Sequence, residues 1–269
     1  MRNIGIIAGA GELPKIIARD ARDRGFRVIT VAMEDIASHD LAELSDEIKW
    51  INIGKLGLLI DVLKKNSVKE VIMAGKVSKT ILYKSKIVPD LRAAKLLFSL
   101  KDRSDDTILK AIRDELGKEG INIIDTTTFS PHLLTPIGVL TKDNPSKDEW
   151  KDIEFGWNIA KEIGKLDIGQ TVVVKGLSVI AIEAVEGTDE TIIRGGRLAG
   201  EGVVVVKVSK PHQDMRLDVP VVGMQTINSM IKVSARILAL EAKKSIILNR
   251  DRVIREADEA GITILGVNQ

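Results

Sequence analysis

The sequence predicts an α/β protein whose first half forms a parallel sheet. Short apolar runs typical of buried strands alternate with segments that carry apolar residues at helical spacing. A strand followed by a helix and then by another strand favours parallel pairing, with helices covering the sheet on both faces. At 269 residues the chain exceeds one typical domain, so we expect two.

The first domain is expected to span residues 1–133 and to begin with a buried strand, Ile4–Ala8. The helix after it, Leu13–Asp23, ends at Gly25, because glycine is preferred just beyond the last turn of a helix. Ser104 is a candidate cap for a later helix. The other elements predicted in this domain are strands at Val28–Ala32, Val71–Ala74 and Ile121–Ile124, and helices at Lys55–Lys65 and Ser104–Gly117.

Residues 134–147 are rich in turn formers and charges, and we expect them to link the first domain to a second one at 148–269. Ser146 and Glu149 have the spacing of a capping box that opens a helix. The apolar face of that helix consists of Trp150, Ile153, Trp157 and Ala160, so both tryptophans are expected in the core. The remaining predicted elements are strands at Thr171–Val174, Ser178–Ala184, Val203–Val208, Ser245–Leu248 and Ile262–Val267, and helices at Thr226–Ala242 and Arg250–Ala260.

The composition argues against several classes of protein. A net charge of +2 gives no argument for a nucleic-acid surface, and aromatic residues, at 3%, are too few for a base-stacking platform. The absence of cysteine excludes disulfides, thiolate zinc sites and a cysteine nucleophile, and is compatible with a reducing cytosol. His39, His132 and His212 are not spaced as metal ligands, and no GxSxG, Walker A or HExxH pattern is present. No apolar run has the length of a membrane span.

A glycine turn joins the first predicted strand to the first helix. It consists of Gly9, Ala10, Gly11, Glu12 and Leu13. Glycine lets backbone amides approach a phosphate, and the helix N-terminus attracts negative charge, so these residues are candidates for binding a nucleotide or phosphate. Pro14 stands where the dinucleotide fingerprint has its third glycine, although Glu34 and Asp35 lie near the place of a ribose-binding acid. A nicotinamide cofactor and a turn that needs glycine for geometry alone remain as alternatives.

Two further places carry candidate ligand-binding residues. Gly75 and Lys76 follow a predicted strand at the carboxyl edge of the sheet, where Lys76 either meets a phosphate or is simply solvated. The stretch EAVEGTDETIIRGG, from Glu183 to Gly196, is typical of a charged hairpin loop, and Arg194 and the two glycines make it a possible ligand loop.

The segment after the predicted strand Val203–Val208 combines cations with two carboxylates. Its charged residues are Lys207, Lys210, Asp214, Arg216 and Asp218, and Pro211 and Pro220 lie within it and at its end. Carboxylate oxygens are ligands for Mg²⁺, and Arg and Lys bind phosphate oxygens, so the segment is a candidate site for a metal and a phosphorylated ligand. The alternative is a solvated charged loop.

Several motifs together resemble the LpxI family, the UDP-2,3-diacylglucosamine pyrophosphatases of lipid A biosynthesis. They are IGIIAGAGELP, VIMAGKVSKT, IGQTVVVKGLSVIAIEAVEGTDETIIRGG, VVVKVSKPHQDMRLDVPVVGMQT and ADEAGITILGV. The resemblance runs in collinear order along essentially the whole chain. It implies a Rossmann-like N-terminal domain with a parallel sheet, a family-specific C-terminal α/β domain, and a homodimer.

The resemblance also implies an activity: Mg²⁺-dependent hydrolysis of UDP-2,3-diacylglucosamine to UMP and 2,3-diacylglucosamine 1-phosphate. Water is expected to attack the phosphorus on the sugar side. The enzyme is expected in the cytoplasm, in peripheral contact with the inner membrane and without a nucleic-acid partner. Alternatives are a non-catalytic sensor of nucleotide sugars and a nicotinamide-dependent oxidoreductase.

The site implied by the resemblance lies mainly in the QDMRLD segment, where the family has an essential aspartate. Asp214 and Asp218 both remain candidates, as catalytic residues and as metal ligands. The expected catalytic residues are completed by Arg216 and Lys210. Further expected substrate-binding residues are Gln213, Thr188, Gln225 and Thr226. No sequence feature marks an acyl-chain groove. Candidates for lining one are Ile81, Leu82, Leu96, Leu97 and Phe98, and the alternative is that they pack in the core.

Overall fold

The computed structural model describes residues 2–77, 88–102 and 104–268, and its chain divides into two compact units. The first unit contains residues 1–131 together with 214–218, and the second contains 132–213 and 219–269. Within the range where the sequence predicts a linker, Gly138–Val139 forms strand β6, which pairs antiparallel with β13 (Thr263–Val267). Ile81 and Leu82 lie outside the described residues.

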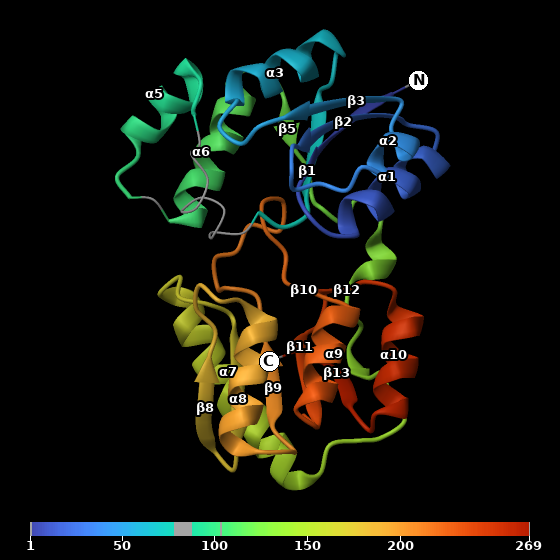
Figure 1. Cartoon of the computed structure of the whole chain (residues 1–269), viewed down its shortest axis with the longest axis vertical. Coiled ribbons are helices and arrows are strands. Elements are labelled where there is room, and N and C mark those ends of the chain that lie inside the picture. The colour runs from blue at the N-terminus through green and yellow to red at the C-terminus, as the bar shows by residue number, and fades with distance from the viewer. Residues whose placement is uncertain (1, 78–87, 103, 269) are drawn as a thin grey trace. The chain divides into compact units, whose positions relative to one another are not determined.

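The first unit is built on a parallel sheet with the strand order β3-β2-β1-β4-β5 (Figure 1). This order is that of a Rossmann-like domain, as expected. The strands are β1 (Asn3–Ala8), β2 (Arg27–Met33), β3 (Glu47–Ile51), β4 (Glu70–Ala74) and β5 (Asn122–Ile123). The helices are α1 (Leu13–Asp23), α2 (Leu41–Leu44), α3 (Leu56–Lys65), α5 (Leu91–Ser99) and α6 (Asp105–Lys118).

Both faces of this sheet are buried, because successive side chains of a strand point to opposite sides. Ile7 of β1 and Ile29 of β2 belong to one hydrophobic cluster, which includes Ile60 of α3 and Leu116 of α6. Their neighbours along the strands, such as Ile6 and Val28, are also fully buried, and α1 contacts β1, β2 and β4. Parallel strands require this burial on two faces, since helices connect them.

The second unit contains a six-stranded mixed sheet in the order β6-β13-β11-β9-β7-β8, and a short parallel pair, β10-β12. Strands β9, β11 and β13 are parallel, and β7 pairs antiparallel with both β8 and β9. The strands are β7 (Thr171–Lys175), β8 (Ser178–Ile182), β9 (Val204–Lys207), β10 (Val221–Val222), β11 (Ile237–Glu241) and β12 (Ile246–Ile247). The helices are α7 (Lys147–Lys165), α8 (Thr188–Ala199), α9 (Met224–Lys232) and α10 (Arg250–Glu259). Pro131–Leu133, where the chain passes from the first unit to the second, forms a 3-10 turn.

Alternate residues of the central strands supply two separate cores. Val204 and Val206 pack with α7, whose Ile153 and Trp157 are buried. Val205 packs on the other face, in a cluster that includes Ile192 of α8, Ile227 of α9 and Val253 of α10. The α/β class, the paired strands β7 and β8, and the capping box of Ser146 and Glu149 are confirmed.

The predicted helix Thr226–Ala242 is wrong in its second half. Helix α9 ends at Lys232, and Ser234 has the left-handed φ of 50° that terminates it. Residues Ile237–Glu241 instead form β11, which is buried throughout and lies between β9 and β13. An apolar run that is buried on all sides has no periodicity to distinguish a strand from a helix.

The predicted hairpin loop in Glu183–Gly196 is also wrong, because Thr188 begins helix α8. Gly195 and Gly196 lie inside this helix and allow close packing: an added Cβ would lie 2.7 Å from Val173 Cγ1 and 2.3 Å from Val233 Cβ, respectively. Their role is therefore contact between α8 and its neighbours. Trp150 is 39% exposed, so the expectation that it lies in the core is wrong. Trp157 is buried, as expected.

Three elements of the first unit were not predicted: β3, α2 and α5. On α5, Phe98 is 88% exposed and Leu96 packs against the core. Across the described ranges, none of the helices combines the length and the hydropathy that crossing a bilayer requires.

Replacement of Gly196 by alanine is expected to destabilise the second unit by about 1–3 kcal/mol, because the new methyl group overlaps Val233. Gly117→Ala is the matched control, since Gly117 is also helical and has no atom within 4 Å of an added Cβ. That change should stabilise the protein by up to about 1 kcal/mol. Chemical denaturation of both variants tests the packing, and a Gly196→Ala protein as stable as the parent would contradict it.

Candidate functional site

The glycine turn and Lys76 meet at the point where the strand order of the first sheet reverses. Gly9–Gly11 follow β1, and Gly75 and Lys76 follow the neighbouring strand β4. In open parallel sheets ligands bind at this switch point, beyond the carboxyl ends of the strands. The structure therefore brings these predicted substrate-binding residues together.

The two loops are hydrogen-bonded to each other, which limits what they offer a ligand. Ala10 N donates to Lys76 O and Lys76 N donates to Ala10 O, each at a distance of 2.9 Å. An added Cβ would lie 2.8 Å from Lys76 O at Gly9 and 2.7 Å from Ala10 O at Gly75. Glycine is therefore required at Gly9 and Gly75 so that the two loops can approach each other. This agrees with the alternative in which the turn needs glycine for geometry alone.

The start of α1 is the part of the turn that remains open. Gly11 has a φ of 99° and no atom within 4 Å of an added Cβ. No hydrogen bond between described backbone groups has the amide of Gly11, Glu12 or Leu13 as its donor. Glu12 Oε1 pairs with Lys15 Nζ at 2.8 Å, so a carboxylate already stands beside this helix end. Only this part of the turn offers amides to an anion.

Asp214 and Arg216 lie in a turn that is packed into the first unit by Leu217. Leu217 is 8% exposed and belongs to the same hydrophobic cluster as Ile7 and Ile29. The amides of Leu217 and Asp218 both donate to Asp214 O, over 2.8 and 3.1 Å. This tight turn fixes the backbone from which the charged side chains project.

Two arginines bind the Asp214 carboxylate. Oδ1 accepts from Arg216 N at 3.1 Å and from Arg216 Nε at 2.8 Å. Oδ2 accepts from Arg216 Nη2 at 2.6 Å and from Arg113 Nη1, on α6, at 3.2 Å. An ionised carboxylate has about four acceptor positions, so this one is fully used. The hydrogen bond from Arg216, helped by Arg113, lowers the pKa of Asp214 to about 2.

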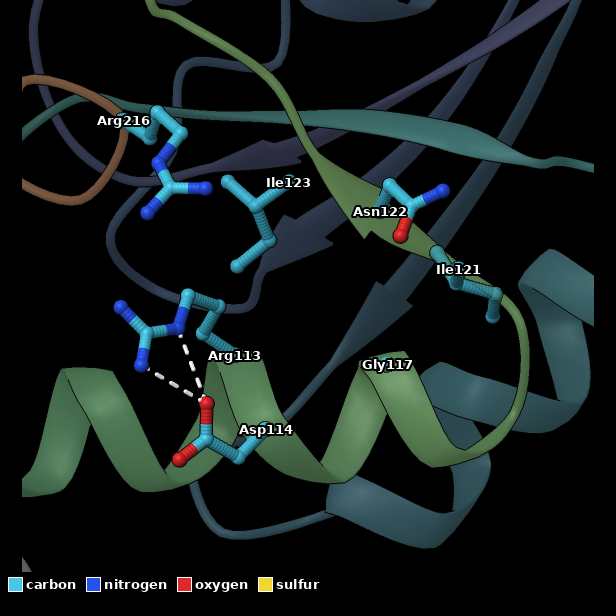
Figure 2. A pocket seen from close by; sticks show the side chains of 7 residues that line it. All are labelled: Arg113, Asp114, Gly117, Ile121, Asn122, Ile123 and Arg216. Atoms are coloured by element: carbon cyan, nitrogen blue, oxygen red, sulfur yellow. Dashed lines mark hydrogen bonds and ion pairs between the residues drawn. The ribbon is translucent and has the colours of Figure 1, made fainter.

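Arg113 and Arg216 also line a cleft of about 470 Å³ at the surface of the first unit (Figure 2). The other lining residues are Asp114, Gly117, Ile121, Asn122 and Ile123. Arg113 is held from its own helix, because Asp114 Oδ1 accepts from Nε at 2.9 Å and from Nη2 at 2.8 Å. Sequence reasoning missed Arg113, since a single arginine on an amphipathic helix carries no signal.

In the second unit, Glu241 anchors the beginning of the charged segment. It ends β11, is 4% exposed, and its Oε2 accepts from Lys161 Nζ at 2.5 Å, Ser209 N at 2.8 Å and Ser209 Oγ at 2.9 Å. Burial raises the pKa of Glu241, but the hydrogen bonds from Lys161 and Ser209 outweigh it, so the pKa is lowered. Because residues 226–242 were predicted to form one helix, Glu241 was not recognised as a candidate. A predicted strand that ends in a glutamate would have indicated it.

Thr188 belongs to a second buried polar cluster, with Glu183 and Lys207. Lys207 is 4% exposed, and its Nζ lies 2.6 Å from Thr188 Oγ1, which in turn donates to Glu183 Oε1 over 2.9 Å. Burial raises the pKa of Glu183, but the charge of Lys207 together with the hydrogen bonds from Thr171, Thr188 and the Gln170 amide outweighs burial, so the pKa is lowered. Both ionised groups are thereby held at the start of α8.

The other predicted residues of the second unit have separate partners. Lys210 forms an ion pair with Asp167, and its amide donates to Gln213 Oε1 over 2.8 Å. Thr226 Oγ1 donates to Asp189 Oδ1 over 2.9 Å, which links the first turns of α9 and α8. Gln225 is exposed in the first turn of α9, as is His212 in the charged segment.

The predicted metal ligands, Asp214 and Asp218, fit Mg²⁺ by chemistry but not by arrangement. Carboxylate oxygens suit this ion, yet the acceptor positions of Asp214 are taken by guanidinium groups. Among the described side chains there is no cluster of three or more His, Cys, Asp or Glu that could hold a metal ion. A cation at Asp214 would therefore have to displace an arginine.

Sheet order, glycine turn and charged segment together define a two-unit α/β protein with a Rossmann-like first unit. The chain matches the family model "LpxI N-terminal domain" over residues 3–133 and "LpxI C-terminal domain" over residues 136–265. It is 34% identical, over 100% of its own length and 98% of the relative's, to the UDP-2,3-diacylglucosamine pyrophosphatase LpxI of Caulobacter vibrioides. The chain belongs to the LpxI family.

Two solved structures resemble the chain distantly. The biotin carboxylase subunit of pyruvate carboxylase shares 13% identity with a TM-score of 0.28, over 74% of this chain and 42% of that one. A biotin carboxylase from Campylobacter jejuni shares 11% identity with a TM-score of 0.29, over 73% and 42%. The chain thus spans less than half the length of these proteins, and neither likeness bears on function.

The arginine contacts predict how Asp214 titrates. Its folded-state pKa, about 2, lies below the ordinary value of 3.8, so ionised Asp214 stabilises the fold above pH 3.8, and this contribution is lost as the pH falls through about 2. Arg216→Gln should raise the pKa toward 3.8, whereas Arg27→Gln, whose partner is Glu47, should leave it unchanged. NMR titration of the Asp214 carboxyl carbon tests this; an ordinary pKa in the parent protein would refute the arginine contacts.

Proposed function

We propose that this chain hydrolyses the pyrophosphate of UDP-2,3-diacylglucosamine to UMP and 2,3-diacylglucosamine 1-phosphate, a step of lipid A biosynthesis. The observation that carries the proposal is the full-length match to the LpxI enzyme of Caulobacter vibrioides, which is named for this substrate. The family models support it over both units. The segment with the cations and carboxylates lies within the C-terminal match.

Pyrophosphate cleavage requires neutralisation of the negative charge that develops on the phosphate oxygens. In this proposal Arg216 and Lys210 supply cationic donors, and Asp214 and Asp218 supply the carboxylates. Water attacks the phosphorus on the sugar side, the bond from that phosphorus to the bridging oxygen breaks, and UMP leaves with the bridging oxygen. Arg216 is suited to this role because its side chain is 46% exposed and projects from a fixed turn.

Dependence on Mg²⁺ is part of the proposal, with Asp214 and Asp218 as its protein ligands. Mg²⁺ characteristically uses one or two carboxylates together with substrate phosphates, so a pair of aspartates is an adequate protein contribution. When bound, the ion would supply charge neutralisation and a more acidic water.

The nucleotide end of the substrate is assigned to the glycine turn. Support comes from the open amides at Gly11–Leu13 and from the position of Lys76 at the switch point. Thr188, Gln213, Gln225 and Thr226 are proposed as further substrate contacts. A cytoplasmic location, peripheral contact with the inner membrane and a homodimer complete the proposal.

Alanine at Asp214 or at Asp218 is expected to lower turnover of UDP-2,3-diacylglucosamine by about 10²-fold or more, if each removes a contact made in the transition state. Release of UMP by the purified protein, with and without added Mg²⁺, measures this. Asp148→Ala is the matched control, because Asp148 is an exposed aspartate whose ion-pair partner is Lys151 of the same helix, at 2.8 Å.

Near-normal turnover in both the Asp214 and the Asp218 variant would refute their assignment. Binding of the substrate without any release of UMP from the parent protein would instead favour the nucleotide-sugar sensor. Bound nicotinamide after gentle purification would favour the oxidoreductase.

Hydrolysis in ¹⁸O-labelled water determines which phosphorus is attacked. We expect the label in 2,3-diacylglucosamine 1-phosphate, because attack on the sugar-side phosphorus transfers the water oxygen to that product. Mass spectrometry of both products gives the result. Label in UMP would reverse the direction of attack and require a new assignment of the cations to the two phosphates.

A further inference from the structure

The fully occupied carboxylate of Asp214 conflicts with its proposed role as a metal ligand. Four guanidinium or amide hydrogens point at its two oxygens, from Arg216 and from Arg113. A divalent cation binds the same lone pairs and is repelled by the same two positive charges. In the arrangement observed, the carboxylate is a partner for arginine and not for a metal.

We propose that Arg113 and Arg216 are built-in counter-ions of Asp214, and that this carboxylate becomes available to a divalent cation only when phosphate oxygens take over the guanidinium donors. The inference rests on the proposed pyrophosphate hydrolysis and adds Arg113 to its machinery as a positioning residue. Metal binding then depends on the anionic ligand because the ligand displaces the arginines from Asp214. Any direct contact between metal and phosphate adds to this dependence.

The guanidinium groups have donors to spare for such an exchange. Each arginine carries five N–H donors. Arg216 uses Nε and Nη2 on Asp214, and Arg113 uses Nε and Nη2 on Asp114 and Nη1 on Asp214. The remaining hydrogens belong to side chains that line the 470 Å³ cleft, which gives an anion access to them (Figure 2). Guanidinium binds phosphate oxygens in the same forked geometry as a carboxylate, so one acceptor can replace the other.

The two arginines are unequal in this arrangement. Arg216 makes three of the contacts to Asp214, is 46% exposed and lies on the same turn, so it can rotate away without disturbing the core. Arg113 is 29% exposed, is fixed by Asp114 and makes one longer contact of 3.2 Å. Arg216 is thus the group that moves, and Arg113 sets where the carboxylate lies.

Binding of Mn²⁺ to the full-length protein, without phosphate, tests the inference. An adjacent opposite charge shifts the proton affinity of a carboxylate by roughly 1–3 pKa units, so removing it should tighten cation binding by about tenfold or more. Arg216→Gln should therefore bind Mn²⁺ at least about tenfold more tightly than the parent, and Arg113→Gln should show a smaller gain. Electron paramagnetic resonance of free Mn²⁺ gives the affinities.

Two controls separate this effect from a general loss of positive charge. Arg27→Gln removes a cation of the same unit whose partner is Glu47, at 3.6 Å, and should bind Mn²⁺ as the parent does. The double variant Asp214→Asn with Arg216→Gln should lose the gain, because the released carboxylate is gone. Equal affinity in the parent and Arg216→Gln, or a gain that survives Asp214→Asn, would overturn the inference.

Sulfate provides an independent measurement, since it offers tetrahedral oxygens to arginine and binds Mn²⁺ weakly itself. Added sulfate should tighten Mn²⁺ binding by the parent protein and have little effect on Arg216→Gln. Sulfate that leaves the parent's affinity unchanged would count against the exchange. These measurements involve no turnover, so their failure would leave the proposed hydrolysis to be judged by UMP release alone.

Discussion

Strands that are buried on both faces leave charged side chains few places besides the strand ends, and this constraint organises both units. In the first, β1 and β4 are followed by the glycine turn and by Lys76, which meet at the switch point. In the second, the buried strands β9 and β11 end in Lys207 and Glu241. Glu241 forms an ion pair with Lys161, and Lys207 contacts Thr188, which donates to Glu183. Both charges have polar partners, because an uncompensated buried charge costs far more than an exposed one. The position of the candidate chemistry thus follows from how the sheets are covered.

Much of the first unit could be predicted, because its signals are local. Strand, glycine turn and helix alternate in order, and the predicted strands Ile4–Ala8, Val28–Ala32 and Val71–Ala74 all lie within the observed sheet. The second unit was harder where burial removes periodicity. Ile237–Glu241 is apolar on both faces and therefore continued the helical pattern of α9. Gly195 and Gly196 suggested a loop, although their small size serves the packing of a helix.

The candidate site shows a similar division between what is local and what is not. The cations and carboxylates of the segment 207–218 are visible as residues, and their pattern was sufficient to propose phosphate and metal chemistry. Their partners are distant in sequence: Asp214 meets Arg113 of α6, Ser209 meets Glu241, and Lys207 meets Thr188 and the nearby Glu183. In the sequence, Asp214 has the features of a metal ligand, but in the fold arginines bind its carboxylate. A cation can therefore reach this carboxylate when the arginines release it.

The placement of Leu217 has a consequence for how the protein is made. Its side chain completes the hydrophobic core of a unit that otherwise ends at Pro131, so a residue synthesised much later belongs to the N-terminal core. As the chain leaves the ribosome, the first sheet can form early, but one part of its core stays exposed until the turn 214–218 has emerged. A protein truncated after residue 131 would keep all five strands of that sheet and still lack this contact. Completion of this N-terminal core therefore requires a residue from the C-terminal half of the chain.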